Sequence, residues 1–181
     1  LCRFEGNAQG FRVVTRLDTY PDDGGMRLTY ATLGTFTKYP QDSLSAVSGS
    51  GVSRKKFGYF SADGARFVEV ANILGLRARS ATSYARHPLA FLMEAADDIC
   101  YGILDIEDGY VLRKLRFTEV DELLGAVGGR RGGEPRTVPR EPPAKGRSER
   151  DLVAYLRARA IRHLIDEVVV SFAEHEAGML S

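Results

Sequence analysis

Residues 86–105 have the sequence RHPLAFLMEAADDICYGILD, and this stretch decides the fold of the chain. In a helix, Asp97, Tyr101 and Asp105 occupy positions i, i+4 and i+8, so their side chains form one polar row. The row continues an apolar face that begins with Leu89, whereas a surface helix carries its charges on the opposite side. Buried carboxylates cost several kcal/mol unless they meet a cation, a metal ion or hydrogen-bond donors. We therefore expect the row to point into the protein, toward a binding partner.

The same spacing permits a second interpretation. In that interpretation Asp97 is a solvated residue at the edge of the apolar face, and the Tyr101 ring fills space with its hydroxyl group in water. Asp105 then pairs with a basic side chain. The local sequence is compatible with both interpretations.

Composition and charge limit the class of protein. With 181 residues, of which 44% are hydrophobic, the chain can bury one core and a small second unit. A net charge of +1 provides no global attraction for nucleic acid or anionic membranes. No apolar run approaches the ~20 residues of a membrane span, and no secretory signal pattern opens the chain. Two cysteines, Cys2 and Cys100, form no disulfide framework, which favours a cytoplasmic protein without membrane contact.

Apolar residues recur at helical spacing along most of the chain, and we find no alternating strand pattern of any length. The predicted fold class is therefore all-α. Helices are expected at residues 5–17, 29–39, 62–74, 88–108, 117–127 and 151–177. In the first of them, Arg12 and Arg16 are expected to face away from the apolar side. Residues 110–116 are expected to form a short strand or connector, and residues 128–150 an irregular exposed loop.

Several residues mark the predicted helix ends. Thr29 and Ser61 are expected as N-terminal caps, because their hydroxyl oxygens can accept backbone N–H donors. Pro40 is expected to stop the second helix, since the residue before a proline disfavours helical backbone. Gly75 and Gly109 are expected just beyond the ends of two other helices.

Five short motifs follow one another along the chain. They are FEGNAQGFR at residues 4–12, KYP at 38–40, KFGYF at 56–60, HPLAFLMEAADDICYGILDIEDG at 87–109 and LRARAI at 156–161. Together they resemble the motifs of the bacterial deoxyguanosinetriphosphate triphosphohydrolases, a branch of the HD-domain phosphohydrolases, over nearly the whole chain. The resemblance implies an HD-domain-like helical bundle.

The resemblance also implies how the chain is divided. Residues 1–110 correspond to the C-terminal half of an HD phosphohydrolase domain, and residues 151–181 to the start of the HD-associated helical domain. Residues 111–150 form a connector with a flexible Gly/Pro/Arg-rich loop. Because the first and last predicted helices run almost to the two ends, we interpret the chain as the central-to-C-terminal portion of a longer enzyme.

A metal site follows from the same resemblance. In the family, a His, a His-Asp pair and a distant Asp hold the metal ion, and Asp97 resembles the distant Asp. A carboxylate suits Mg²⁺ or Mn²⁺, and histidine partners favour transition metals. The other ligands and the catalytic His and Glu precede the FEGNAQ segment in the family, so we expect no catalytic residue here and no activity from this chain alone. His87, His163 and His175 form no His-Asp pair and are not expected as ligands.

The implied reaction is attack of water on the α-phosphorus of a dNTP, with dGTP as the expected substrate, releasing deoxynucleoside and tripolyphosphate. The resemblance assigns Tyr101 and Asp105 to the sugar 3′-hydroxyl, with the Tyr101 ring leaving no room for a 2′-hydroxyl. Lys38 is assigned to the phosphates, with Tyr39 beside it, and Asn7 to the substrate pocket. From local sequence alone, Lys38 is equally explained as a lysine that faces a helix dipole.

Partners follow from the family and from the Arg-rich loop. The resemblance implies a homo-oligomer. The loop at residues 128–150 is interpreted as a solvated linker, with contact to single-stranded DNA as the alternative, although the loop lacks aromatic stacking partners. An alternative function for the whole chain is a non-catalytic helical module that binds nucleotide or nucleic acid as a regulator.

Overall fold

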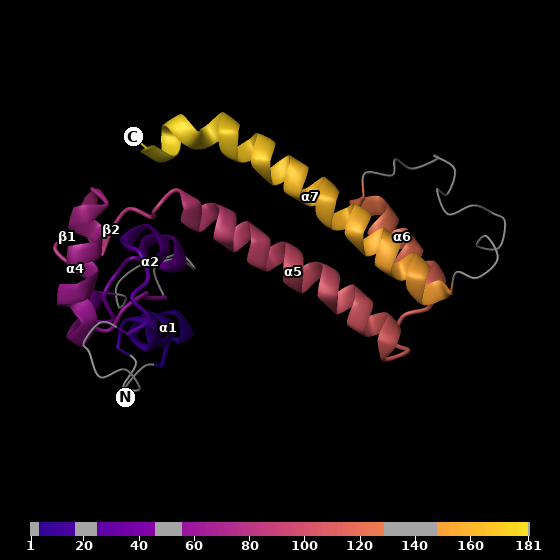
Figure 1. Ribbon diagram of the computed structural model, residues 1–181, viewed down its shortest axis with the longest axis horizontal. Helices are drawn as coiled ribbons and strands as arrows, with labels where there is room; N and C mark the ends of the chain where they lie inside the picture. The colour runs from indigo at the N-terminus through magenta and orange to yellow at the C-terminus, as the bar shows by residue number, and fades with distance from the viewer. Residues whose placement is uncertain (1–3, 17–24, 46–55, 129–147, 181) are drawn as a thin grey trace. The chain divides into compact units, whose positions relative to one another are not determined.

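The structure, a computed structural model, describes residues 4–16, 25–45, 56–128 and 148–180. Its helices are α1 (Gly6–Thr15), α2 (Tyr30–Phe36), the 3₁₀ turn η2 (Ser61–Asp63), α4 (Gly64–Ile73), α5 (Leu89–Val111), α6 (Phe117–Val127) and α7 (Glu149–Leu180), as Figure 1 shows. The predicted all-α class is confirmed. The chain divides into two compact units, Leu1–Glu94 and Ala95–Ser181, and α5 contributes residues to both. The domain boundaries expected from the family resemblance stay a prediction.

Aromatic side chains make the core of the first unit. Phe67 of α4 is fully buried, stacks on Tyr59 with ring centroids 4.5 Å apart, and meets the edge of Phe11 of α1 at 5.6 Å. The Tyr84 ring lies 5.7 Å from Phe67. One ring therefore joins two helices and two extended segments, which makes Phe67 the centre of this core.

The helix ends of the first unit agree with the sequence in part. The Thr29 hydroxyl accepts the N–H of Thr32 at 3.2 Å, as predicted for a cap, and Gly75 has a left-handed φ of +64° after α4. Ser61 is not a cap, because η2 precedes α4 and no side chain caps either element. Helix α2 ends at Phe36, before the expected stop at Pro40.

Two short strands, β1 (Ala78–Ser80) and β2 (Ser83–Tyr84), form an antiparallel pair that the sequence did not predict. Strands of three and two residues are too short to show an alternating pattern. Backbone contacts hold the pair, and the N–H of Tyr84 donates to the carbonyl of Pro40 at 2.8 Å. The strands therefore follow from tertiary contact and not from local sequence.

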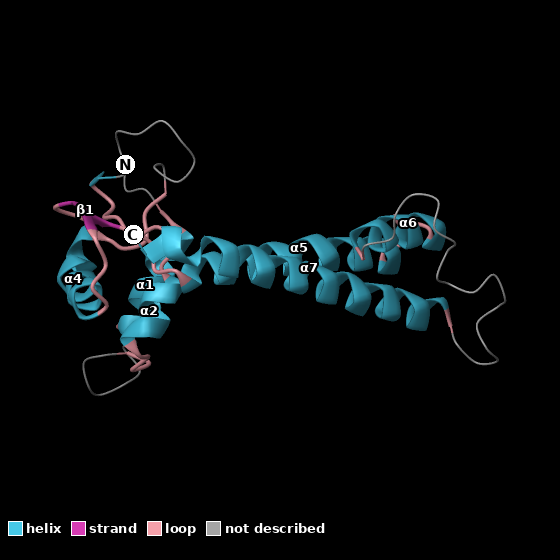
Figure 2. Cartoon of the chain, turned by 90° about the horizontal axis from the view of Figure 1, so that it is seen from above, coloured by secondary structure: helices cyan, strands magenta, loops and turns pink. Residues whose placement is uncertain are grey.

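The core of the second unit lies among α5, α6 and α7, and Figures 1 and 2 both show α6 beside the N-terminal part of α7. The bounds predicted for α6 are confirmed. The buried side chains of this core are Ile103, Val120, Leu124, Val153, Leu156 and Ala160. An ion pair between Arg157 Nη1 and Glu107 Oε1, at 2.7 Å, fastens α7 to α5 beside this core.

The apolar face predicted along the last helix is buried only in its N-terminal part. Leu152 and Leu156 are buried, whereas Ile165 is 48% exposed, because α6 covers only the beginning of α7. The neighbouring Val169 and Val170 are also exposed. The period of the sequence placed these residues in a helix, and only tertiary contact decides which of them are covered.

The segment between α5 and α6 corrects one prediction and decides between two alternatives. Gly109 lies inside α5 and not beyond its end, and residues 112–116 form a turn, which fits the expected connector and not the expected strand. The N–H groups of Lys114 and Leu115 both donate to the carbonyl of Gly109, at 2.7 and 2.9 Å. Leu115 lies so close that a Cβ on Gly109 would stand 2.8 Å from its Cδ1 atom. The glycine therefore serves close packing.

The expected irregular loop at residues 128–150 lies, apart from its ends, outside the described residues. Among the described helices, none is both long enough and apolar enough to cross a membrane.

Candidate functional site

The KYP segment is held in place by backbone contacts from two other parts of the first unit. The N–H of Gly58 donates to the carbonyl of Gln41 at 3.1 Å, and Tyr84 donates to Pro40 from the other segment. Gly58 passes so close that a Cβ there would collide with the backbone oxygen of Tyr39. The glycine of the KFGYF motif therefore lets its strand-like segment pass directly beneath the KYP segment.

Two cationic side chains face the Tyr39 ring, which is only 9% exposed. Lys56 Nζ lies 5.5 Å and Arg86 Cζ 5.2 Å from the ring centroid, both within the range of cation–π attraction. Lys38 precedes Tyr39 in the chain and is partly exposed. Arg86 also donates to Glu94 Oε2 at 2.7 Å. We call Tyr39, Lys56, Arg86, Glu94 and the sequence neighbour Lys38 the Tyr39 cluster, which contains three cationic residues and one carboxylate. Its net positive charge suits an anionic ligand.

Asn7 lies in the first turn of α1, next to the buried residue Ala8. Its Nδ2 atom donates to Glu5 Oε1 at 2.7 Å, and within the described ranges its carboxamide oxygen has no partner. Ala8 packs in one small cluster with Phe57, the residue that follows Lys56. The fold of the first unit therefore brings the FEGNAQ motif and the KFGYF motif together.

The polar row of α5 does not point into the core of the second unit. Tyr101 is 65% exposed and Asp105 is exposed, while Asp97 is partly exposed. Helix α5 turns Ile103 toward α6 and α7, and the row lies on the opposite side of the helix. The expectation that Tyr101 and Asp105 are buried is therefore wrong for this structure. Their assignment to substrate is a separate matter and stays a prediction.

The described side chains do not form a metal site by themselves. Among residues 4–16, 25–45, 56–128 and 148–180, no group of three His, Cys, Asp or Glu side chains comes together in a way that could hold a metal ion. One carboxylate does not hold a metal ion against water, so Asp97 could be only one ligand of a larger set. Its assignment as a metal ligand stays a prediction.

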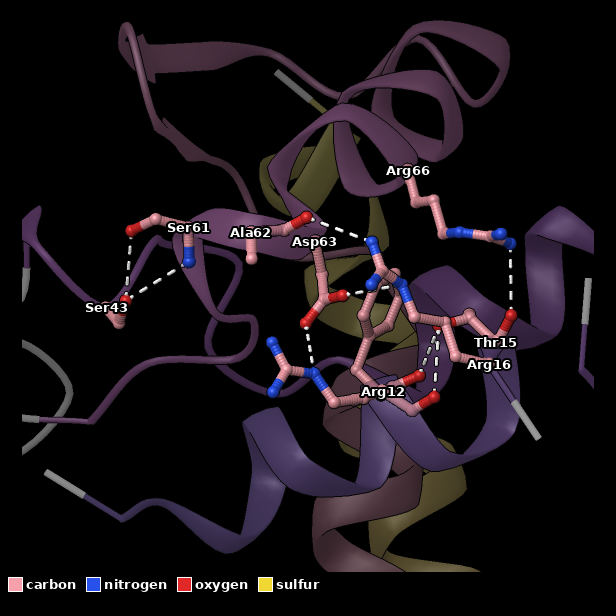
Figure 3. A network of polar contacts seen from close by, with 9 residues as sticks. Arg12, Thr15, Arg16, Ser43, Ser61, Ala62, Asp63 and Arg66 are labelled. Atoms are coloured by element: carbon pink, nitrogen blue, oxygen red, sulfur yellow. Dashed lines mark hydrogen bonds and ion pairs between the residues drawn. The ribbon is translucent and has the colours of Figure 1, made fainter. Parts of the chain in front are cut away.

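A buried carboxylate ties α1 to the start of α4, as Figure 3 shows. Asp63 is fully buried, and its Oδ2 atom accepts a hydrogen bond from Arg12 Nε at 2.8 Å. Arg16 Nε lies 3.0 Å from Oδ1 as an ion pair, without the alignment of a hydrogen bond. The Arg12 guanidinium also lies 4.4 Å above the Phe60 ring. Both arginines therefore point at one anion.

The sequence indicated only that Arg12 and Arg16 face away from the apolar side of the first helix, and this network adds a shared partner that it did not indicate. Arg16 Nη2 also donates to the carbonyl of Ala62 at 3.1 Å, and Arg66 Nη1 donates to the carbonyl of Thr15 at 3.0 Å (Figure 3). These contacts connect residues about fifty positions apart, which no local pattern could predict. They fix the helix that carries Asn7.

Comparison with known proteins identifies relatives across the chain. A deoxyguanosinetriphosphate triphosphohydrolase-like protein of Pseudomonas aeruginosa is 43% identical over 179 residues, which cover 98% of this chain and 39% of that protein. A protein of the same name from Synechocystis sp. is 42% identical over 185 residues, covering 99% of this chain and 40% of that protein. The chain belongs to the deoxyguanosinetriphosphate triphosphohydrolase family.

Family membership confirms the resemblance that the five sequence motifs indicated. The deoxyguanosinetriphosphate triphosphohydrolase of Enterobacter sp. (strain 638) is 36% identical over 126 residues, which cover 68% of this chain and 22% of that protein. The chain spans about two fifths of the length of the relatives that match it throughout. No family model matches the chain.

In this chain of the triphosphohydrolase family, two residues of the Tyr39 cluster were not predicted from the sequence as site residues. Lys56 ends a short basic run, and Arg86 directly precedes the HPL motif. Because Lys56 is also the first residue of the KFGYF motif, the only available signal was a position in or next to a motif. Their common feature is proximity to the Tyr39 ring, which depends on how three separate segments cross.

His87, at the start of the same motif, caps helix α5. The N–H of Leu89 donates to His87 Nδ1 at 3.2 Å, and the Thr35 hydroxyl lies 3.3 Å from the same atom. Because Nδ1 accepts, the neutral ring carries its hydrogen on Nε2. Burial disfavours the charged ring and lowers the pKa of His87 below its ordinary value.

We expect acid to weaken the fold through His87. The pKa of His87 is lower in the folded chain than the unfolded value of about 6.5. The stabilising contribution of neutral His87 is therefore complete above the unfolded-state pKa. It is lost as the pH falls through the lower pKa of the folded state. The measurement is the free energy of unfolding between pH 8 and pH 5. In His87→Asn, whose side chain can cap but does not titrate, the fall should be smaller; an equal fall would contradict the prediction.

Proposed function

We propose that the whole protein is a metal-dependent dNTP triphosphohydrolase, with dGTP as a substrate, and that this chain supplies much of its substrate site. The products would be a deoxynucleoside and tripolyphosphate. The observation that carries the proposal is the Tyr39 cluster. Its cations come from the KYP motif, the KFGYF motif and the residue before the HPL motif, and the family's members are named as dGTP triphosphohydrolases. The substrate carries its negative charge on a chain of three phosphates, which such a cluster suits.

In this proposal, the Tyr39 cluster holds the phosphates. Lys38 and Lys56 act as point charges, whereas the planar guanidinium of Arg86 can donate two parallel hydrogen bonds. The buried Tyr39 ring sets where two of these cations lie, because each approaches its face. Holding the charge in place before the substrate arrives lowers the cost of binding and of the charge that develops during reaction.

The sugar is assigned to Tyr101 and Asp105 of α5, and a further substrate contact to Asn7. The Tyr101 ring and the Asp105 carboxylate are exposed, so both are accessible to a 3′-hydroxyl. A ring against the sugar would also exclude a 2′-hydroxyl and so favour deoxynucleotides. The carboxamide oxygen of Asn7, which has no partner among the described residues, can accept a hydrogen bond from the ligand.

Asp97 is proposed as one ligand of Mg²⁺ or Mn²⁺. When bound, such an ion polarises a phosphoryl oxygen and lowers the pKa of coordinated water. The remaining ligands and the catalytic His and Glu are proposed to lie outside these 181 residues, in the HD portion of the whole protein. The whole enzyme is further proposed to be cytoplasmic and homo-oligomeric, with single-stranded DNA as a possible partner of its Arg-rich loop.

Replacing Lys38 tests the proposal. In the whole protein, Lys38→Ala should lower kcat/KM for dGTP about 100-fold, since a charge-assisted contact to phosphate contributes about 2–3 kcal/mol. The measurement is the rate at which deoxyguanosine and tripolyphosphate are released. The control is Lys114→Ala, which removes an exposed lysine on the turn after α5 and should leave kcat/KM unchanged. Unchanged hydrolysis in Lys38→Ala would contradict the role of the cluster, and binding of dGTP without turnover in the whole wild-type protein would favour the regulatory alternative.

A further inference from the structure

A cleft of about 750 Å³ opens in the second unit where the end of α5, the turn after it and the starts of α6 and α7 meet. Its volume lies within the range of sites for small ligands. The lining residues that matter here are Tyr110, Arg113, Arg116, Phe117, Glu149 and Arg150. Three of these six side chains are arginines, and two are aromatic.

The cleft holds more positive charge than its own carboxylate can balance. Arg113 and Arg150 form no ion pair within the part of the chain that the structure describes. Glu149 accepts a hydrogen bond from the Tyr110 hydroxyl at 2.8 Å, and Arg116 pairs with Glu119 at 3.2 Å, outside the lining. Among the described residues, two guanidinium groups of the cleft therefore have no carboxylate partner, and they suit an anion.

The backbone at Arg113 adds an independent observation. Its φ of +56° places a non-glycine residue in the left-handed region, which costs about 1 kcal/mol and suits glycine or asparagine. The turn requires this conformation, because the two residues after Arg113 close back onto Gly109. An arginine at the strained position points to a role for its side chain.

We propose that this cleft binds a nucleotide, with its phosphate on Arg113 and Arg150 and its base against the aromatic wall. Guanidinium groups match phosphate oxygens in a planar, bidentate geometry. Tyr110 and Phe117 pack partly against the core of the second unit and also line the cleft, where their rings can stack on any base. The proposal concerns the second unit alone and does not rest on the substrate site proposed above. A free nucleotide and one nucleotide of a single strand share this chemistry.

The test measures binding to the full 181-residue chain at constant salt. The probes are AMP, inorganic phosphate and a ten-residue oligodeoxyadenylate, and NMR reports which backbone amides shift. We expect AMP or the oligonucleotide to shift the amides of Tyr110, Phe117 and Arg150. Binding of AMP assigns the cleft to free nucleotides, whereas binding of the oligonucleotide alone assigns it to a strand. Phosphate that binds as tightly as either would overturn the role of the base.

Two variants and a control make the test specific. Arg113→Gly and Arg150→Ala should each weaken binding about tenfold, as expected for loss of one charge-assisted contact. Arg113→Gly should not lower the melting temperature, because it relieves the left-handed backbone. The control is Arg79→Ala, an exposed arginine of β1, with unchanged affinity. If neither cleft variant weakens binding while the control behaves as stated, the proposal is wrong.

Discussion

Replacing Phe67 with alanine should lower the free energy of unfolding by about 4 kcal/mol, the typical loss for a fully buried aromatic ring. Phe67 is 0% exposed and contacts three other rings, those of Phe11, Tyr59 and Tyr84. Its removal would leave a cavity that α1 and α4 cannot close without losing their mutual contact. The measurement is urea denaturation followed by far-UV circular dichroism, with tyrosine fluorescence as a second probe since the chain has no tryptophan.

The matched control for this prediction is Phe4→Ala. Phe4 is 79% exposed, so the same chemical change there should alter the free energy of unfolding by less than about 0.5 kcal/mol. Similar losses for the two variants would mean that the ring cluster around Phe67 does not hold the first unit together.

The second large effect is expected at Asp63. Asp63→Ala should lower the free energy of unfolding by about 3 kcal/mol, because it removes the anion that Arg12 and Arg16 share. This loss of unfolding free energy is at the lower end of the range for a broken buried ion pair. The reason is that both arginine side chains are partly exposed and can be hydrated once Asp63 is removed. The measurement is again urea denaturation. An exposed carboxylate of the same unit provides the control: Glu69→Gln should change the free energy by less than about 0.5 kcal/mol.

A double-mutant cycle separates the ion pairs from simple loss of packing. Arg16→Ala should be destabilising in the wild-type chain and nearly neutral when Asp63 is already alanine. The coupling should exceed about 1 kcal/mol. Independent, additive losses would show that the two side chains do not stabilise each other, and the contact between α1 and α4 would then need another cause.

The candidate substrate site illustrates how local motifs become one surface. Lys38 and Tyr39 were predicted from the KYP motif, yet the cations that face the Tyr39 ring come from residues 17 and 47 positions further along the chain, Lys56 and Arg86. Gly58 is what permits the approach, because a side chain at that position would strike the Tyr39 backbone. The motifs were predicted from the sequence. The cluster forms only because the chain segments that carry them cross in the folded structure.

For the polar row on α5, the helical spacing was predicted correctly, but the burial of its side chains was predicted wrongly. The spacing of Asp97, Tyr101 and Asp105 places them in one row on a helix, as predicted. Burial was inferred from the apolar residues that precede the row. In the second unit the helix instead packs through Ile103, so the side that carries Tyr101 is exposed.

The sequence by itself determined the all-α class, the bounds of α6, the cap at Thr29 and membership of the triphosphohydrolase family. These features depend on hydrogen bonds between residues three or four positions apart and on the order of the motifs. The amino-acid sequence alone therefore specifies them. Only the tertiary structure decided that Arg12 and Arg16 meet at Asp63, that two cations face Tyr39, and which side of α5 is covered. These contacts join residues that lie far apart in the chain, and their geometry exists only once the backbone has folded.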